Sequence, residues 1–123
     1  MEGLRKRILI VDDDTSIHTA LKIIFEKAGY RVFAALDAMQ GTMLAKQLKP
    51  DLIVLDMMMP AGGGFSVYDS LHLMVSTFQF SFLIYTSADL STIKIQKSDS
   101  VEILSKSAKI EELLAAAARL TSR

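Results

Sequence analysis

The chain has 123 residues, half of them hydrophobic, which is enough for one domain with a core of its own. It contains no cysteine, so disulfide frameworks and thiolate metal sites are excluded. Its 14 basic and 14 acidic residues give a formal net charge of zero, so we expect no binding to nucleic acid or anionic lipid. No apolar run approaches the roughly 18 residues of a membrane-spanning helix, and we expect a soluble, cytoplasmic protein.

The first part of the chain predicts a strand followed by a helix. A β-branched run over about 7–12, bounded by charged residues, has the pattern of a buried strand. Apolar residues then recur at helical spacing until Gly29, a residue type that commonly follows the end of a helix. Asp14, Thr15 or Ser16 can cap the start of this helix.

The next part predicts a second strand, a second helix and a third strand. Residues 30–35 have the strand pattern, and Asp37 can cap the helix that follows. Pro50 ends that helix because proline cannot donate the next backbone hydrogen bond. The run at about 51–56 is apolar on both faces until it reaches Asp56, which is typical of a strand buried in a parallel sheet.

The remainder of the chain predicts one more turn, two helices and two strands. The three glycines at 62–64 are expected to form the turn. Helical spacing is found next, in Phe65, Tyr68, Leu71 and Met74. The final two strands and an alanine-rich helix follow at about 80–86, 101–105 and 110–117. The stretch between the last two strands is polar and has no clear periodicity.

Continuous apolar strands that alternate with helices predict an α/β fold, namely a doubly wound five-stranded parallel sheet with helices on both faces. We expect residues 1–123 to form this single domain, without an output domain. In such a sheet, functional side chains collect just beyond the carboxyl ends of the strands. The residues at these ends are Asp12, Asp13, Asp14, Asp56, Thr86, Ser105 and Lys106.

These side chains suit phosphoryl chemistry. Clustered carboxylates repel one another unless a cation lies among them, and Mg²⁺ is a hard cation that prefers oxygen ligands. A carboxylate such as Asp56 can then attack a phosphoryl group, while Lys106 and Thr86 contact the phosphoryl oxygens. Taken alone, Lys106 is more commonly a surface lysine, Thr86 a strand-end hydroxyl and Asp12–Asp14 an acidic helix cap. Their joint occurrence at four strand ends favours the functional interpretation.

Two segments resemble the response-regulator receiver domains of two-component signalling. They are residues 8–14, Ile-Leu-Ile-Val-Asp-Asp-Asp, and residues 50–60, which carry Asp56 and are followed by Gly64 eight residues beyond that aspartate. Thr86 follows Asp56 by 30 residues, as the switch threonine or serine of that family does. The resemblance extends over essentially the whole chain and implies the flavodoxin-like strand order 2-1-3-4-5.

The resemblance also implies roles and partners. Asp56 would be the phosphoacceptor, Thr86 the switch hydroxyl and Lys106 the ammonium of the site. Mg²⁺, or Mn²⁺ in its place, would be held by three carboxylates and one backbone carbonyl, those of Asp12, Asp13, Asp56 and Met58. A histidine kinase or phosphotransfer protein would supply the phosphoryl group, and the modified domain would switch its protein–protein interactions. A homodimer through the family's fourth helix, fifth strand and fifth helix is compatible with the resemblance.

Three features near the end of the chain depart from the family pattern. Ser107 stands where the family has a proline after the lysine, so we expect a trans peptide bond there or a strained exception. Ile103 replaces an aromatic residue, which excludes rotation of an aromatic ring as the readout. Thr86 and Lys106 are 20 residues apart, a short separation that predicts a shortened or irregular fourth helix.

A further departure concerns the stability of the phosphorylated form. The residue two beyond Asp56 is Met58, and the residue two beyond Thr86 is Ala88. In the family these positions often carry polar groups that orient the attacking water, which these two side chains cannot do by hydrogen bonding. We therefore expect slow autodephosphorylation, with Met58 also screening the site.

Two other functions compete with a phosphorylation switch. One is a degenerate receiver that binds its partners independently of phosphorylation, which the departures at Ile103 and Ser107 favour. The other is a Mg²⁺-dependent phosphatase with an aspartyl intermediate. Such enzymes usually place a second acid two residues after the nucleophile, where this chain has Met58, so we rank the phosphatase last.

Overall fold

The computed structural model describes residues 5–72 and 79–122, with Ala61 described only in its backbone. Five strands alternate with helices along these residues. In chain order the elements are β1 (Arg7–Val11), α1 (Thr15–Lys27), β2 (Arg31–Ala35), α2 (Ala38–Leu48), β3 (Leu52–Leu55), the 3₁₀ turn η2 (Pro60–Gly62), α3 (Gly63–His72), β4 (Phe82–Thr86), the 3₁₀ turn η3 (Leu90–Thr92), β5 (Val101–Ser105) and α4 (Ile110–Leu120).

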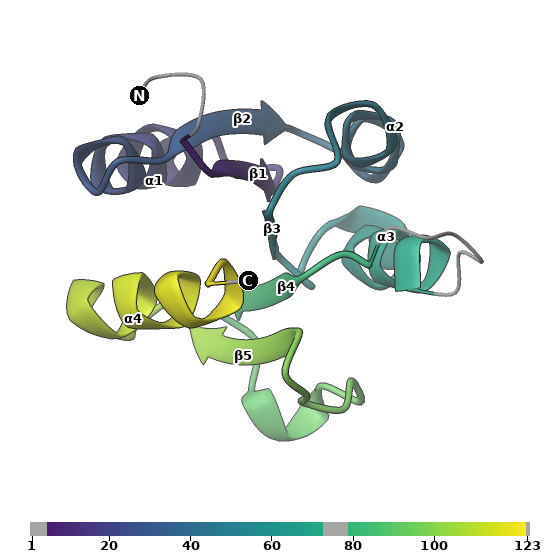
Figure 1. Cartoon of the computed structure of the whole chain (residues 1–123). Helices are drawn as coiled ribbons and strands as arrows, with labels where there is room; N and C mark the ends of the chain where they lie inside the picture. The colour runs from purple at the N-terminus through teal and green to yellow at the C-terminus, as the bar shows by residue number, and fades with distance from the viewer. Residues whose placement is uncertain (1–4, 73–78, 123) are drawn as a thin grey trace.

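The five strands form one sheet in the order β2-β1-β3-β4-β5, and every neighbouring pair is parallel. This confirms the predicted α/β fold and strand order. Figure 1 shows the strands between α1 and α4 on one side and α2 and α3 on the other, so helices cover both faces. Several strands are one or two residues shorter than predicted. The residues that the prediction included and the strands do not are Asp12, Asp51, Asp56, Phe80 and Ser81.

Alternate residues of the central strands fill two separate cores, one on each face. Under α1 and α4 the strands contribute Ile8, Ile10, Leu52, Val54, Leu83 and Tyr85. Under α2 and α3 they contribute Leu9, Val11, Ile53, Leu55, Phe82 and Ile84. Residues 52–55 are all buried, as expected for a strand covered on both faces. The two faces of this central strand are therefore covered by different pairs of helices.

The predicted helix caps are found at two of the helices. The Asp14 carboxylate accepts a hydrogen bond from the Ser16 amide, 2.9 Å away, and begins α1. The Asp37 carboxylate accepts from the Gln40 amide at 2.8 Å and begins α2. Both bonds satisfy amides that have no partner within the first helical turn. The two capping residues therefore fix where the chain leaves β1 and β2.

The predicted turn at the three glycines is wrong for two of them. Only Gly62 has a left-handed backbone, with φ at +68°. Gly63 and Gly64 are instead the first residues of α3, and both are buried. Of the apolar residues expected in this helix, Met74 lies outside the described residues. The absence of side chains at the start of α3 allows the helix to approach the loop that follows β3.

The structure describes every residue of the segment between β4 and β5, which is 87–100. This segment contains no α-helix. One 3₁₀ turn, η3, begins at Asp89, whose carboxylate accepts from the Ser91 amide at 3.0 Å. Beyond it Ile95 is 7% exposed and packs into the core under α2 and α3. The predicted shortening of the fourth helix is thus complete, and the Ile95 side chain covers this part of the sheet instead.

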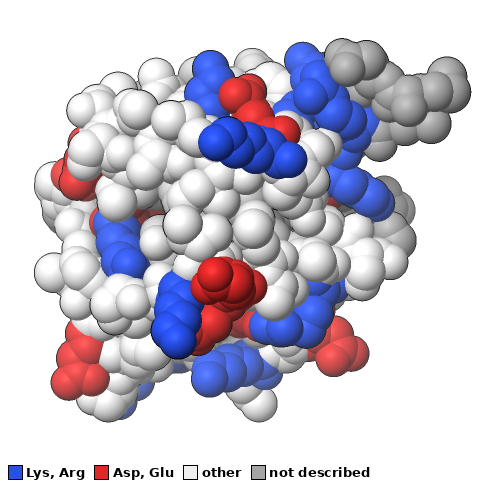
Figure 2. All heavy atoms as spheres, turned by 90° about the vertical axis from the view of Figure 1, so that its left-hand side faces the viewer, with Lys and Arg blue, Asp and Glu red and all other residues white. Residues whose placement is uncertain are grey.

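Charges of both signs are interspersed on the side of the molecule where α1 and α4 lie, as Figure 2 shows. One ion pair joins two elements: Arg119 on α4 forms a bidentate contact with Glu102 on β5, at 2.7 and 3.0 Å. None of the helices described within 5–72 and 79–122 is long and apolar enough to cross a membrane.

Candidate functional site

The carboxyl ends of four strands bring together the side chains that the sequence singled out. Asp12 follows β1, Asp56 follows β3, Thr86 ends β4 and Lys106 follows β5. Asp12 and Asp56 are 2% and 4% exposed and Thr86 is fully buried, while Asp13 is exposed. A buried carboxylate is costly without partners, so the contacts of these two aspartates decide whether the site is built for them.

Each oxygen of the Asp56 carboxylate has a partner. Oδ1 accepts hydrogen bonds from the Thr86 hydroxyl and from the Met58 backbone amide, both at 3.1 Å. Oδ2 lies 3.4 Å from the ammonium of Lys106. The Asp56 amide donates to the Val11 carbonyl at 3.0 Å, which ties the residue to the end of β1. Asp56 therefore lies between a hydroxyl donor and a cation.

Asp12 shares the same cation. Its Oδ2 lies 2.8 Å from Lys106 Nζ, and its Oδ1 accepts from the Asp14 amide at 2.9 Å. Partial burial disfavours the charged form of the Lys106 side chain, but its contacts with Asp12 and Asp56 outweigh burial, so the pKa of Lys106 is raised above its ordinary value. The lysine is therefore held as a cation between two buried carboxylates.

Asp12, Asp13 and Asp56 can also hold a metal ion. One carboxylate oxygen from each lies within 4.8 Å of the others. Three carboxylates facing a single ammonium leave an excess of negative charge, which favours a divalent cation. All the side-chain donors are oxygens, the ligand type that Mg²⁺ prefers, and the exposure of Asp13 leaves room for bound water. The residues present thus fit Mg²⁺.

A pair of serines positions Lys106 in the absence of the proline that the family has next to it. Ser105 Oγ accepts a hydrogen bond from the Ser107 amide at 3.1 Å, and the two hydroxyls are 2.8 Å apart. The Lys106 amide donates to the Thr86 carbonyl at 2.9 Å. Peptide bonds throughout the described residues are trans, including the one between Lys106 and Ser107. The Lys106 side chain nevertheless reaches both acids.

Two residues at the site were missed or misjudged in the sequence. His18, which the sequence did not single out, lies partly buried, with Nε2 only 2.6 Å from the Asp12 carbonyl oxygen. Nε2 therefore carries the proton and donates it. Gly64 was recognised only as part of a motif, although a Cβ atom there would overlap the carbonyl oxygen of Asp56. For His18 the sequence offered one signal, namely its position one helical turn beyond the capping residue Asp14.

The family is decided by comparison with known proteins. A family model described as the response regulator receiver domain matches residues 8–118. The chain belongs to this family. Relatives confirm the assignment: RpaA, a DNA-binding dual master transcriptional regulator of Synechocystis, is 41% identical over 119 residues, which cover 95% of this chain and 49% of RpaA.

Protein PilH of Pseudomonas aeruginosa is 34% identical to this receiver domain over 110 residues, which cover 88% of this chain and 91% of PilH. Among solved structures, the signal receiver domain of a putative Luxo repressor protein from Vibrio parahaemolyticus matches with a TM-score of 0.81 and 28% identity. That match covers 98% of this chain and 92% of the other. The chain thus spans about half the length of RpaA and most of PilH.

Proposed function

We propose that this receiver domain accepts a phosphoryl group on Asp56 from a histidine kinase or phosphotransfer protein, in a Mg²⁺-dependent reaction, and thereby switches its protein–protein interactions. The observation that carries the proposal is the pair of contacts on the Asp56 carboxylate, with the Thr86 hydroxyl on one oxygen and the Lys106 ammonium on the other. A donor and a cation beside the same carboxylate are the groups that can stabilise the charge on a transferring phosphoryl group.

In the proposed reaction a carboxylate oxygen of Asp56 forms the new O–P bond as the N–P bond to the donor histidine breaks. Lys106 lies where it can neutralise a phosphoryl oxygen, and Thr86 can donate its hydroxyl proton to another. Asp12, Asp13, Asp56 and the Met58 carbonyl would hold Mg²⁺, which supplies further positive charge to the phosphoryl oxygens. The buried Asp12 lies 2.8 Å from Lys106 Nζ and holds this ammonium beside Asp56 in the unmodified chain.

The direct test is incubation of the chain with acetyl phosphate, with Mg²⁺ or with EDTA. We expect an intact-mass increase of one phosphoryl group with Mg²⁺ only, and peptide mapping after borohydride reduction should place it on Asp56. A chain that stays unmodified, or carries the group on another residue, would contradict the proposal.

Mg²⁺ alone is expected to stabilise the fold. A ligand that binds only the folded state at 100 times its dissociation constant adds about 2.7 kcal/mol to the free energy of unfolding. The increase should be much smaller in Asp13→Asn, which removes the exposed carboxylate of the cluster. Asp14→Asn is the matched control, because it removes a neighbouring charge outside the cluster and keeps the cap of α1. Urea unfolding with and without Mg²⁺ measures the effect, and equal stabilisation of the wild type and Asp13→Asn would refute the metal site.

The phosphorylated form is expected to be long-lived. The exposure of the Met58 side chain, 59%, does not support the predicted screening of the site, but the side chain offers no hydrogen bond to an attacking water. Met58→Asn supplies an amide at this position and should shorten the lifetime of the phosphorylated chain by about tenfold, less than the roughly 10²–10⁴-fold typical of a general acid or base because the amide only orients the water. Mass spectrometry over time, which follows the loss of the phosphoryl group, measures this lifetime in both chains. A wild-type lifetime as short as that of Met58→Asn would show that the methionine has no protective effect.

One observation favours a second function, an interaction module that does not depend on phosphorylation. The described segment between β4 and β5 has no α-helix, and Ile103 on β5 is only partly buried. The face that would change on phosphorylation therefore differs from the one that the family resemblance implied. Binding to a partner with equal affinity before and after acetyl phosphate treatment would select this second function.

A further inference from the structure

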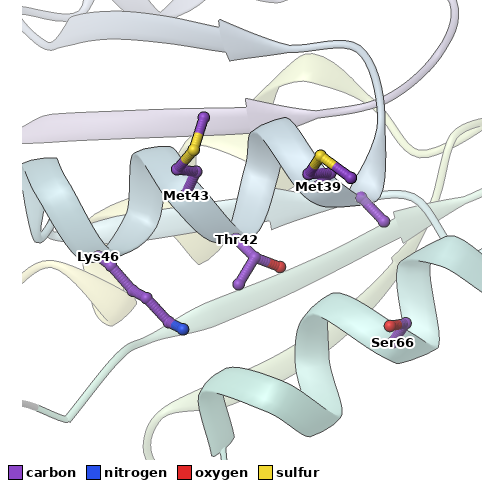
Figure 3. Close-up of a pocket in the computed structure, with 6 residues that line it drawn as sticks. Met39, Thr42, Met43, Lys46 and Ser66 are labelled. Atoms are coloured by element: carbon purple, nitrogen blue, oxygen red, sulfur yellow. The ribbon is translucent and has the colours of Figure 1, made fainter.

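A hollow between α2 and α3 shares no residue with the carboxylate cluster and plays no part in the proposed function. Its volume is about 470 Å³, and it is lined by Ala38, Met39, Thr42, Met43, Lys46 and Ser66. Figure 3 shows Thr42 and Lys46 pointing from α2 toward α3, with Ser66 on the facing helix. The hollow is therefore a groove between two helices.

The exposed stripe of α2 is apolar because the helix packs through its smallest residues. Gly41 and Ala45 are the buried residues of α2, and a Cβ atom on Gly41 would come within 2.8 Å of the Val11 side chain. The methionines are consequently left outside, with Met39 79% exposed and Met43 53% exposed. Residues three and four apart are neighbours on a helix, so the methionines adjoin Lys46, although Figure 3 shows Met43 pointing to the side of α2 away from α3.

The walls of the groove favour a macromolecule over a small ligand. A small-molecule pocket buries most of its ligand and usually most of its lining, whereas these methionines are more than half exposed. Methionine side chains are flexible and polarisable, and they recur at surfaces that accept apolar faces of different shape. A groove between two helices is the geometry into which a third helix packs, with its apolar residues at helical spacing.

The charge of the groove specifies the partner further. α2 contains no acidic residue, and Lys46 forms no ion pair within the part of the chain that the structure describes. Lys49, directly after the helix, is also exposed. Asp69 on α3 is one turn beyond Ser66 but does not pair with Lys46. An occupant that places a carboxylate beside Lys46 would satisfy this cation while its apolar residues cover the methionines.

We propose that the groove between α2 and α3 binds an amphipathic helix of a partner protein, with aliphatic residues against Met39 and Met43 and an aspartate or glutamate against Lys46. The surface is separate from the Asp56 site, so the proposal stands whether or not Asp56 is phosphorylated.

Two synthetic helical peptides test the proposal. Both have leucines at positions i, i+3, i+4 and i+7, and they differ only in carrying glutamates or lysines beside that stripe. Titration into the ¹⁵N-labelled chain should shift the amides of α2 and α3 with the acidic peptide, and the basic peptide should bind at least tenfold more weakly. Lys46→Glu should reverse this preference. Met39→Gln together with Met43→Gln should weaken the acidic peptide at least tenfold.

Matched controls lie on the opposite side of the sheet. Lys22→Glu and Ile23→Gln change an exposed lysine and a 52% exposed isoleucine on α1, and both should leave binding unchanged. Circular dichroism of every variant separates lost binding from lost structure. The proposal is overturned if neither peptide shifts the amides of α2 and α3, or if Lys46→Glu keeps the wild-type preference. Tighter binding to anionic phosphatidylserine vesicles than to the acidic peptide would likewise overturn it, because the groove would then be a membrane contact.

Discussion

Asp56→Asn is expected to abolish phosphoryl uptake while leaving the chain folded. The asparagine oxygen can still accept from the Thr86 hydroxyl, which is 3.1 Å from Oδ1 in the wild type, so the buried donor keeps its partner. The amide nitrogen, however, is no nucleophile toward phosphorus, and the variant should show no mass increase with acetyl phosphate and Mg²⁺.

The same substitution should raise stability in the absence of Mg²⁺. The carboxylate oxygens of the cluster lie within 4.8 Å of one another, and two unit charges about 4 Å apart repel by about 4 kcal/mol at an effective dielectric constant near 20. Loss of the 3.4 Å contact with Lys106 offsets part of this gain. We therefore expect a net increase of roughly 1–2 kcal/mol in the free energy of unfolding.

Asp14→Asn serves as the control for Asp56→Asn, because it also replaces an aspartate by an asparagine next to the site, in the acidic run that contains Asp12 and Asp13. The Asp14 carboxylate accepts its hydrogen bond from the Ser16 side chain and amide, which hold its pKa below the usual value, and it is not in the metal cluster. This variant should take up phosphoryl as the wild type does. Should Asp56→Asn be phosphorylated to the wild-type extent, or unfold where Asp14→Asn does not, Asp56 would be a structural residue.

The sequence was sufficient for the sheet and for the meeting of the site residues, for one physical reason. A strand buried on both faces is apolar throughout, as 52–55 are, and only parallel sheets covered by helices require many such strands. Once the strands are parallel, their carboxyl ends share one edge. The strand order that the family resemblance implied then places Asp12, Asp56, Thr86 and Lys106 on neighbouring strands, so that they come together.

Features that depend on packing between distant segments could not be predicted in this way. Ile95 is buried although its surroundings in the sequence are polar, because the sheet beneath it lacks a covering helix. The methionines of α2 had the spacing of a core stripe but lie outside, because Gly41 lets the helix approach β1 through its other face. The contact of His18 with the Asp12 carbonyl requires the exact path of the loop between β1 and α1.

Gly64→Ala is expected to destabilise the chain by about 3 kcal/mol or more, at the upper end of the cost of overpacking a core. An added Cβ would overlap the Asp56 carbonyl oxygen and would lie 2.8 Å from Met57 Cα and 2.9 Å from the Asp56 carbonyl carbon. All three are backbone atoms, which cannot rotate away as a side chain can. Relief requires α3 or the loop after β3 to move, and urea unfolding measures the cost.

Gly63→Ala separates this clash from the general effect of alanine at the start of α3. Its Cβ would meet the Ala38 Cβ at 3.3 Å and the Met59 Cβ at 3.5 Å, and its backbone is already helical, so we expect a change within about 1 kcal/mol. Similar stabilities of the two variants would contradict the close approach at Gly64. Because the atoms displaced in Gly64→Ala belong to Asp56 and Met57, the variant that remains folded should also accept phosphoryl more slowly, whereas Gly63→Ala should not.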